Sequence, residues 1–247
     1  MAKQKGIVQL TGTLNGLNFY FRKGVPVVRT AGGGFNGKAI KTKPEMVRVR
    51  DNASEFGRVS SAKKVFRLGL HPFLKDLADV SLHGRLMRLF QEVKRCDTVS
   101  ERGQRRFEKG LATDEGKALL LSFVFTSQKA SAFLPGTGVF DAALERYTLS
   151  AVQLKRLRLP KGASGMQLCL GVLVADFEQG TTAFFKSTAV QLHAQNAADF
   201  VVTPEPLPVG TGVRIAVLQV RYYQEVNGTI YLFQELSQQG LEVVGVY

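Results

Sequence analysis

Histidine and cysteine are scarce in this chain, which has three His and two Cys among its 247 residues. Cys96 and Cys169 are too few for a disulfide framework and have no CxxC or His-adjacent spacing, so we expect both to be small buried residues in a reduced compartment. His71, His83 and His193 are scattered, which leaves little material for a metal site or for acid–base catalysis. No cofactor is therefore expected.

Long apolar runs are missing as well. No stretch approaches the roughly 18 consecutive apolar residues that a membrane helix requires. The opening MAKQKGIVQL is positively charged, but Gln9, Thr11 and Thr13 interrupt the apolar segment that a signal peptide would need. The composition predicts a globular chain with no membrane span and no signal peptide, cytoplasmic at synthesis.

Catalytic motifs are equally sparse. The chain has no G-x-S-x-G, and its carboxylates are too scattered to predict a glycosidase or a metal-assisted hydrolase. The segment from Gly32 to Ala39, GGGFNGKA, satisfies G-x-x-x-x-G-K, but Ala39 stands where a P-loop has the Ser or Thr that binds Mg²⁺. Pro44 also interrupts the helix that would follow. This segment reads as a flexible basic linker.

What the chain does have is positive charge, and this charge is confined to one part. Residues 1–110 contain 23 Lys and Arg against 9 Asp and Glu, a net charge of +14, whereas residues 111–247 contain 10 against 11, a net charge of −1. Such asymmetry predicts an electrostatic partner for the first part, most often nucleic acid and less often an anionic membrane or an acidic protein surface.

The N-terminus reads as a β-meander with strands at about 6–13, 17–22 and 25–30. Asn15-Gly16 predicts a type I′ turn between the first two, and Lys23-Gly24 separates the second from the third. Pro26 lacks an N–H for the ladder, so the third strand is expected at an edge.

An apolar hairpin surface is predicted to serve assembly. Phe19 and Phe21 share a face with Leu17, which favours packing against a neighbouring fold or subunit. A stacking platform for single-stranded nucleic acid, formed by Phe19, Tyr20 and Phe21 beside Arg22 and Lys23, is the alternative. The predicted assembly residues are Leu17, Phe19, Phe21, Val25 and Val27.

A flexible basic arm at 31–43 and two helical regions follow. Apolar spacing from Val47 to Leu70 predicts a helix, with a possible break at Gly57 and an end or a kink at Pro72. A second helical region is predicted over 73–95. Cations of the meander, the arm and the first helix are predicted to contact a polyanion, with a merely solvated helix face as the alternative. These cations are Arg22, Lys23, Arg29, Lys38, Lys41, Lys43, Arg48, Arg50, Arg58, Lys63, Lys64 and Arg67.

Beyond a polar connector at 96–116 the pattern becomes β-rich. Seven or eight short runs, beginning with KALLLSFVF and ending with LEVVGVY, are separated by Gly and Pro turns, and Asn227-Gly228 predicts another type I′ hairpin. The expected fold is α+β, with a β-meander and basic arm at 1–43, a helical region at 44–110 and an antiparallel β-sandwich at 111–247, for which an Ig-like arrangement is one option.

Five segments of the chain carry a resemblance to known sequences, namely MAKQKGI, GTLNGLNFY, GVPVVRTAGGG, VRVRDNASEFGRVSSAKKVFR and, near the C-terminus, YYQEVNGTIYLF. These segments resemble an uncharacterised group of proteins from Bacteroidetes bacteria and their mobile elements. It covers about the first 70 residues best. The resemblance implies a lineage and an architecture, and no activity.

A meander of this kind is marginal alone in water, because it cannot bury its own aromatic face. We therefore expect a non-enzymatic structural protein that assembles with itself, as filament or shell subunits do, through the hairpin and arm, with the basic half facing a polyanion or an acidic neighbour. The alternative is a monomeric or dimeric nucleic-acid-binding protein. An enzyme with a site at strand ends is a third option, since one sequence does not reveal site geometry.

Overall fold

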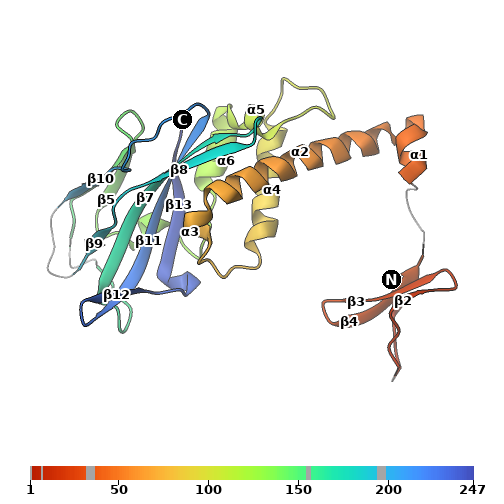
Figure 1. The fold of residues 1–247 in the computed structure, drawn as a ribbon, viewed down its shortest axis with the longest axis horizontal. Helices are drawn as coiled ribbons and strands as arrows, with labels where there is room; N and C mark the ends of the chain where they lie inside the picture. The colour runs from red at the N-terminus through yellow and green to blue at the C-terminus, as the bar shows by residue number, and fades with distance from the viewer. Residues whose placement is uncertain (1, 7, 32–36, 154–156, 194–198) are drawn as a thin grey trace. The chain divides into compact units, whose positions relative to one another are not determined.

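The computed structural model describes residues 2–6, 8–31, 37–153, 157–193 and 199–247 (Figure 1). The chain divides into two compact units, residues 1–50 and 51–247. Most of the Gly-rich segment that satisfies the P-loop spacing, residues 32–36, lies outside the described residues.

The first unit contains a four-stranded antiparallel sheet in the order β1-β4-β3-β2. Its strands are β1 (Ala2–Lys3), β2 (Gly12–Leu14), β3 (Leu17–Arg22) and β4 (Val25–Thr30). Both turn residues have positive φ at Asn15-Gly16 (49° and 79°) and again at Lys23-Gly24 (51° and 77°), the type I′ geometry that matches the strand twist. The meander predicted from these turns is present.

Two details of the meander differ from the prediction. The first strand covers Gly12–Leu14 rather than 6–13, and β4 is not an edge strand, because β1 pairs with it at Val27 and Val28. Pro26 is still accommodated, since it contributes its carbonyl, which accepts a hydrogen bond from the Gln4 backbone N–H at 3.0 Å.

The basic arm was predicted to be irregular, and its described part is helical instead. Gly37–Thr42 forms α1, and Pro44–Met46 forms a 3₁₀ turn. The Arg50 guanidinium stabilises this helical segment, because it donates hydrogen bonds to the carbonyl oxygens of Ile40 at 2.6 Å and Lys43 at 3.0 Å. The Ile40 carbonyl is an acceptor that the helix end leaves without an intrahelical partner, whereas the Lys43 carbonyl also accepts from the Met46 N–H at 3.1 Å.

The helices are α2 (Val47–Gly69), α3 (His71–Leu74), α4 (Leu82–Arg95), α5 (Phe107–Leu111) and α6 (Asp114–Ser122). α2 continues through Gly57 without a break. The predicted helix at 73–95 is in fact α3 and α4, separated by a turn in which the Asp79 carboxylate accepts from the Ser81 N–H at 2.7 Å. Short polar side chains that bind the nearby backbone favour such turns over helix.

The run KALLLSFVF was predicted as a strand, and this prediction is wrong because most of it belongs to α6. Thr113 caps the helix, since its hydroxyl accepts from the Gly116 N–H at 3.0 Å, and Asp114 and Glu115 occupy the first turn. A Thr cap followed by acidic residues stabilises a helix start. Only Leu120 of the three consecutive leucines is fully buried.

The second unit contains two antiparallel sheets. The larger has β12-β11-β7-β8 as its path, and β13 and β9 extend it beside β11 and β7. These strands are β7 (Gly165–Asp176), β8 (Thr181–Lys186), β9 (Val190–Leu192), β11 (Val213–Val226), β12 (Thr229–Leu232) and β13 (Gln239–Val246). The smaller sheet, in the order β10-β6-β5, contains β5 (Thr137–Asp141), β6 (Arg146–Ser150) and β10 (Phe200–Val202). The predicted hairpin at Asn227-Gly228 joins β11 to β12 with φ of 52° and 75°.

Strand alternation creates two cores in this unit. Cys169, Leu173 and Val217 point to one face of the larger sheet, where they pack with α2 to α6. Leu168 and Leu170 point to the other, where they pack with Leu149 and the rest of the smaller sheet. Helices, large sheet and small sheet therefore form three layers, with the helices beside the sheet in Figure 1.

The mixed α+β class is confirmed, and two antiparallel sheets do face one another. An Ig-like sandwich has one core between its sheets, whereas this unit has a second core beneath a layer of helices. The expected boundary between residues 110 and 111 falls inside α5, and α5 packs in the same core as the large sheet.

Candidate functional site

The four-stranded N-terminal sheet has two chemically different faces. Directly opposed residues of antiparallel strands lie on the same face. The β3–β4 register pairs Phe19 with Val28 and Tyr20 with Val27, so successive residues of β3 fall on opposite faces.

One face is apolar and, at its strand positions, uncharged. Leu17 and Phe21 on it are 42% and 47% exposed, and Leu14 is 63% exposed. Such large apolar groups are unusual as a contiguous exposed set, which makes this face a candidate interaction surface. We call it the apolar face, and its residues are Leu14, Leu17, Phe19, Phe21, Pro26 and Val28.

The opposite face carries the cations of the sheet. Lys3 pairs with Val27 and Arg22 with Val25, and Arg29 lies with its guanidinium carbon 5.6 Å from the centre of the Tyr20 ring. We call this the basic face, and its residues are Lys3, Tyr20, Arg22, Val25, Val27 and Arg29. Among the described residues of the sheet only Val27 is buried, at 8% exposure.

The predicted assembly residues are therefore divided between the faces. Leu17, Phe19 and Phe21 lie on the apolar face, whereas Val25 and Val27 lie on the basic face. The turn already implied this division, because a two-residue loop at Lys23-Gly24 makes Arg22 the partner of Val25.

The predicted polyanion-binding cations of the first unit have different local roles. Arg50 holds the end of α1, and Lys43 forms an exposed ion pair with Glu45 at 3.6 Å. Lys38 and Lys41 lie on α1, Lys23 lies in the β3–β4 turn, and Arg48 lies in the first turn of α2, all of them exposed.

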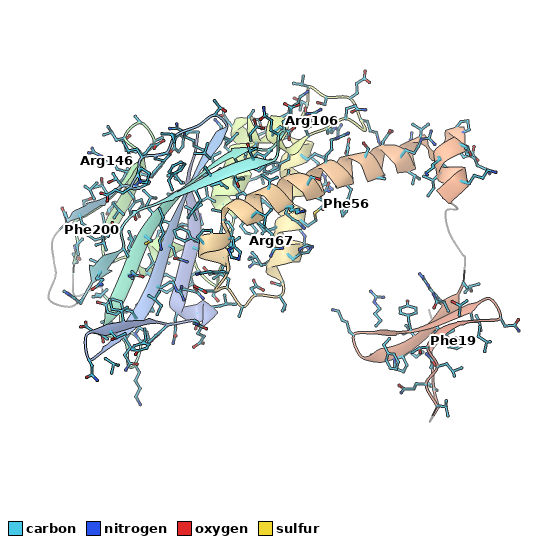
Figure 2. All side chains as sticks on the ribbon, in the orientation of Figure 1. Phe19, Phe56, Arg67, Arg106, Arg146 and Phe200 are labelled. Atoms are coloured by element: carbon cyan, nitrogen blue, oxygen red, sulfur yellow. The ribbon has the colours of Figure 1, made fainter. Side chains whose placement is uncertain are left out.

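On α2 the predicted cations separate into two groups. The Arg58 guanidinium donates to the Gly103 carbonyl, so this side chain links the helix to the connector before α5. Lys63, Lys64 and Arg67 line a cleft of 590 Å³. Figure 2 shows Arg67 on the part of α2 beside α4, and Phe56 about three turns earlier.

This α2 cleft is formed by ten residues, of which eight come from α2, one, His71, comes from the start of α3, and one, His83, comes from α4. Its lining residues are Phe56, Gly57, Ser60, Ser61, Lys63, Lys64, Arg67, Leu68, His71 and His83, and none of these is a carboxylate. The α2 residues recur at intervals of three and four, so they share one side of the helix.

Lys63 is the least exposed cation of the cleft, at 5%. Its Nζ lies 3.2 Å from His83 Nε2. Burial, followed by the charge of Arg67, lowers the pKa of the Lys63 ammonium. Both effects disfavour a positive charge that has no negative partner, and both would be relieved by an anion in the cleft.

Sequence reasoning found the cations of this cleft but missed Phe56, His71 and His83. Helical spacing could have placed Phe56 on the Lys63 side of α2, whereas His71 belongs to α3. His83 had no such signal, because it comes from another helix, 20 residues beyond Lys63.

Other reactive groups are isolated. Cys169 is buried, and burial raises the pKa of its thiol. Within the described ranges no three His, Cys, Asp or Glu side chains gather in a way that would hold a metal ion. No helix in the described part of the chain is long and apolar enough to cross a membrane.

Comparison with known proteins gave no relatives. No protein-family model, no curated protein and no solved structure matches the chain.

Proposed function

We propose that the protein is a non-enzymatic structural subunit that assembles with copies of itself through the apolar face of its N-terminal sheet. The observation that carries the proposal is the separation of charge across this sheet. The partner that covers the apolar face is the same sheet of a second copy. Larger assemblies such as filaments or shells would add further contacts between copies.

Charge explains why two copies would meet through the apolar face and not through the basic face. Residues 1–50 contain ten Lys and Arg and one acidic residue, Glu45, so two copies of this unit repel each other. Contact through the apolar face brings no strand cation to the interface, whereas contact through the basic face would oppose Arg22 and Arg29 with their counterparts. Like charges placed in an interface are destabilising.

Apolar burial supplies the driving force. Removing a Leu or Phe side chain from water is worth about 1.5–3 kcal/mol, and a sheet this small is marginal without a covered face. Pairing two identical faces about a two-fold axis covers Leu17, Phe19 and Phe21 of both copies at once.

The same geometry supports a polyanion on the outer side. With the apolar faces paired, the basic faces point away from the interface and present Lys3, Arg22 and Arg29 with Tyr20. Nucleic acid is the polyanion best suited to cations beside an aromatic ring. Binding of nucleic acid by an unassembled chain is the second candidate function, and the same charge separation supports it.

Leu17→Glu and Val25→Glu form a matched pair of variants that tests the proposal. Leu17 and Val25 are 42% and 40% exposed, each lies at the start of a strand, and each variant adds one negative charge. Leu17→Glu places the charge in the proposed interface, and we expect self-association to weaken roughly a hundredfold or more. Val25→Glu places it opposite Arg22, and we expect assembly to persist.

Sedimentation velocity and negative-stain microscopy measure assembly in both variants, and titration with a short oligonucleotide measures the basic face. We expect Val25→Glu to weaken oligonucleotide binding and Leu17→Glu to leave it unchanged. A wild-type chain that sediments as a monomer at all concentrations, or equal assembly by both variants, would refute the proposal. Steeply salt-dependent oligonucleotide binding by such a monomer would instead support the second candidate.

A further inference from the structure

The α2 cleft contains more hydrogen-bond donors than acceptors. Lys63 Nζ lies 3.2 Å from Nε2 and 3.5 Å from Nδ1 of His83, and an Arg67 guanidinium nitrogen lies 3.5 Å from Nδ1. A neutral imidazole accepts a hydrogen bond at one nitrogen and carries a proton on the other. If Lys63 donates to Nε2, then Arg67 faces an N–H, and one cation remains without an acceptor.

Nearby carboxylates do not supply the missing acceptor. Asp79 pairs with Arg85 at 2.6 Å, Asp76 pairs with Arg221 at 2.8 Å, and Glu55 pairs with Lys94. In the described ranges no ion pair involves Lys63, Lys64 or Arg67. A buried ammonium without a counter-ion is costly, so the cleft favours an incoming anion.

The shape of the cleft indicates that the anion is attached to something larger. A volume of 590 Å³ falls in the range of small-molecule sites, which run from about 300 to 1,000 Å³. Phe56, 55% exposed, also lines the cleft, seven residues before Lys63 and hence about 10 Å away along the helix axis. Between them the lining is small and polar, with Gly57, Ser60 and Ser61.

We propose that the α2 cleft binds a small phosphate monoester bearing an aromatic ring, such as a nucleoside monophosphate, with the phosphoryl group between Lys63, Arg67 and His83 and the ring against Phe56. A phosphoryl group offers three acceptor oxygens and close to two negative charges, which suits several donors converging from two helices. The exposed ring provides a stacking surface for the aromatic part. This site belongs to the second unit and is independent of the proposed assembly.

Isothermal titration calorimetry at low salt tests the proposal with three probes, namely a nucleoside monophosphate, the same nucleoside without phosphate, and inorganic phosphate. We expect the monophosphate to bind more tightly than either fragment. Arg67→Gln should weaken binding of the monophosphate and of inorganic phosphate roughly tenfold, because one charge-assisted hydrogen bond is lost. Phe56→Ala should weaken monophosphate binding and leave inorganic phosphate unchanged. Arg67 and Phe56 are both exposed, so neither variant threatens the fold.

Arg95→Gln is the matched control, because Arg95 is an exposed cation on α4, the helix that supplies His83. We expect it to bind all three probes as the wild type does. An equal loss of affinity for the monophosphate in Arg95→Gln and Arg67→Gln would show that binding reflects general electrostatic attraction, and would overturn the proposal. So would a wild-type chain that binds none of the three probes at low salt.

Discussion

Replacing Lys94 by Met should cost about 3 kcal/mol of unfolding free energy at neutral pH. Lys94 and Glu55 form an ion pair between α4 and α2, with side chains only 10% and 6% exposed. Removing one member of such a pair leaves a buried charge uncompensated, which typically costs about 3–5 kcal/mol. We expect the lower end, because the Gly103 N–H still donates to the Glu55 carboxylate at 2.8 Å.

The loss of unfolding free energy in Lys94→Met should become smaller as the pH falls. Burial disfavours the Glu55 carboxylate, but hydrogen bonds from Lys94 and Gly103 outweigh burial and lower its pKa below the ordinary 4.5. The wild-type pair is thus fully stabilising above pH 4.5 and loses its contribution as the pH falls through the lowered pKa. Lys94→Met removes the hydrogen bond and the charge of Lys94 while burial remains, so we expect the pKa of Glu55 to be higher in the variant than in the wild type, and acidification to stabilise the variant relative to the wild type. The difference between the two proteins should shrink from pH 7 to pH 4.

Urea denaturation at several pH values measures this effect, with Arg95→Met as the matched control. Arg95 is the next residue of α4 and is exposed, so its replacement should change stability by less than about 0.5 kcal/mol. Adding Glu55→Gln to Lys94→Met should restore much of the loss, since the amide oxygen still accepts from Gly103. A Lys94→Met cost below about 1 kcal/mol that does not vary with pH would show that the pair is solvated, and would refute the reasoning.

Two further outcomes concern stability. Gly57→Ala should raise the unfolding free energy by about 0.5–1 kcal/mol, because Ala favours helix over Gly and the added Cβ meets nothing within 4 Å. Gly69→Ala in the same helix should lower the unfolding free energy, because its Cβ would collide with Leu173. Urea denaturation measures both changes. Asp79 has a pKa lowered to about 2 from 3.8 by its hydrogen bonds with Ser81 and Arg85. Its contribution of about 1–2 kcal/mol should be present above pH 3.8 and lost toward pH 2, so Asp79→Asn should flatten the acid limb of the stability profile, and an unchanged limb would contradict this assignment.

Local signals predicted the parts of the fold that depend on neighbouring residues. Asn15-Gly16 and Asn227-Gly228 fixed two hairpins, since few residues other than Asn and Gly tolerate positive φ at both turn positions. The three leucines at 119–121 led to the wrong prediction of a strand, because a short apolar run fits a buried strand as well as a helix. The decisive information was the cap at Thr113, which precedes the run.

Contacts between residues far apart in the chain could not be predicted from the sequence. The division of apolar residues between a helix-covered and a sheet-covered face of β7 is visible only once both layers are placed. His83 reaches the α2 cleft because α4 crosses beside α2, and no spacing along the chain encodes that approach. The sequence identified the cations as a group. It did not show that Arg50 and Arg58 bind backbone carbonyl groups whereas Lys63 lines the cleft.

The proposed self-assembly and the proposed polyanion binding are coupled by geometry. Two sheets joined through their apolar faces carry two outward basic faces on one particle, and a polyanion long enough to reach both gains a second attachment without a new kind of contact. Linked sites of this kind can raise overall affinity by about 10²–10⁴. The gain vanishes for a ligand that spans one face only.

Ligand length therefore separates the two roles proposed for the sheet. We expect Leu17→Glu to bind a short oligonucleotide like the wild type but to lose affinity for a long one, because the variant presents one basic face per particle. Val25→Glu should weaken binding of both lengths and keep the ratio between them, because it changes each face and leaves the pairing intact. Fluorescence anisotropy with oligonucleotides of increasing length provides the measurement. A wild-type affinity that rises no faster with length than that of Leu17→Glu would show that the basic faces act singly, and that assembly and polyanion binding are unrelated properties of this sheet.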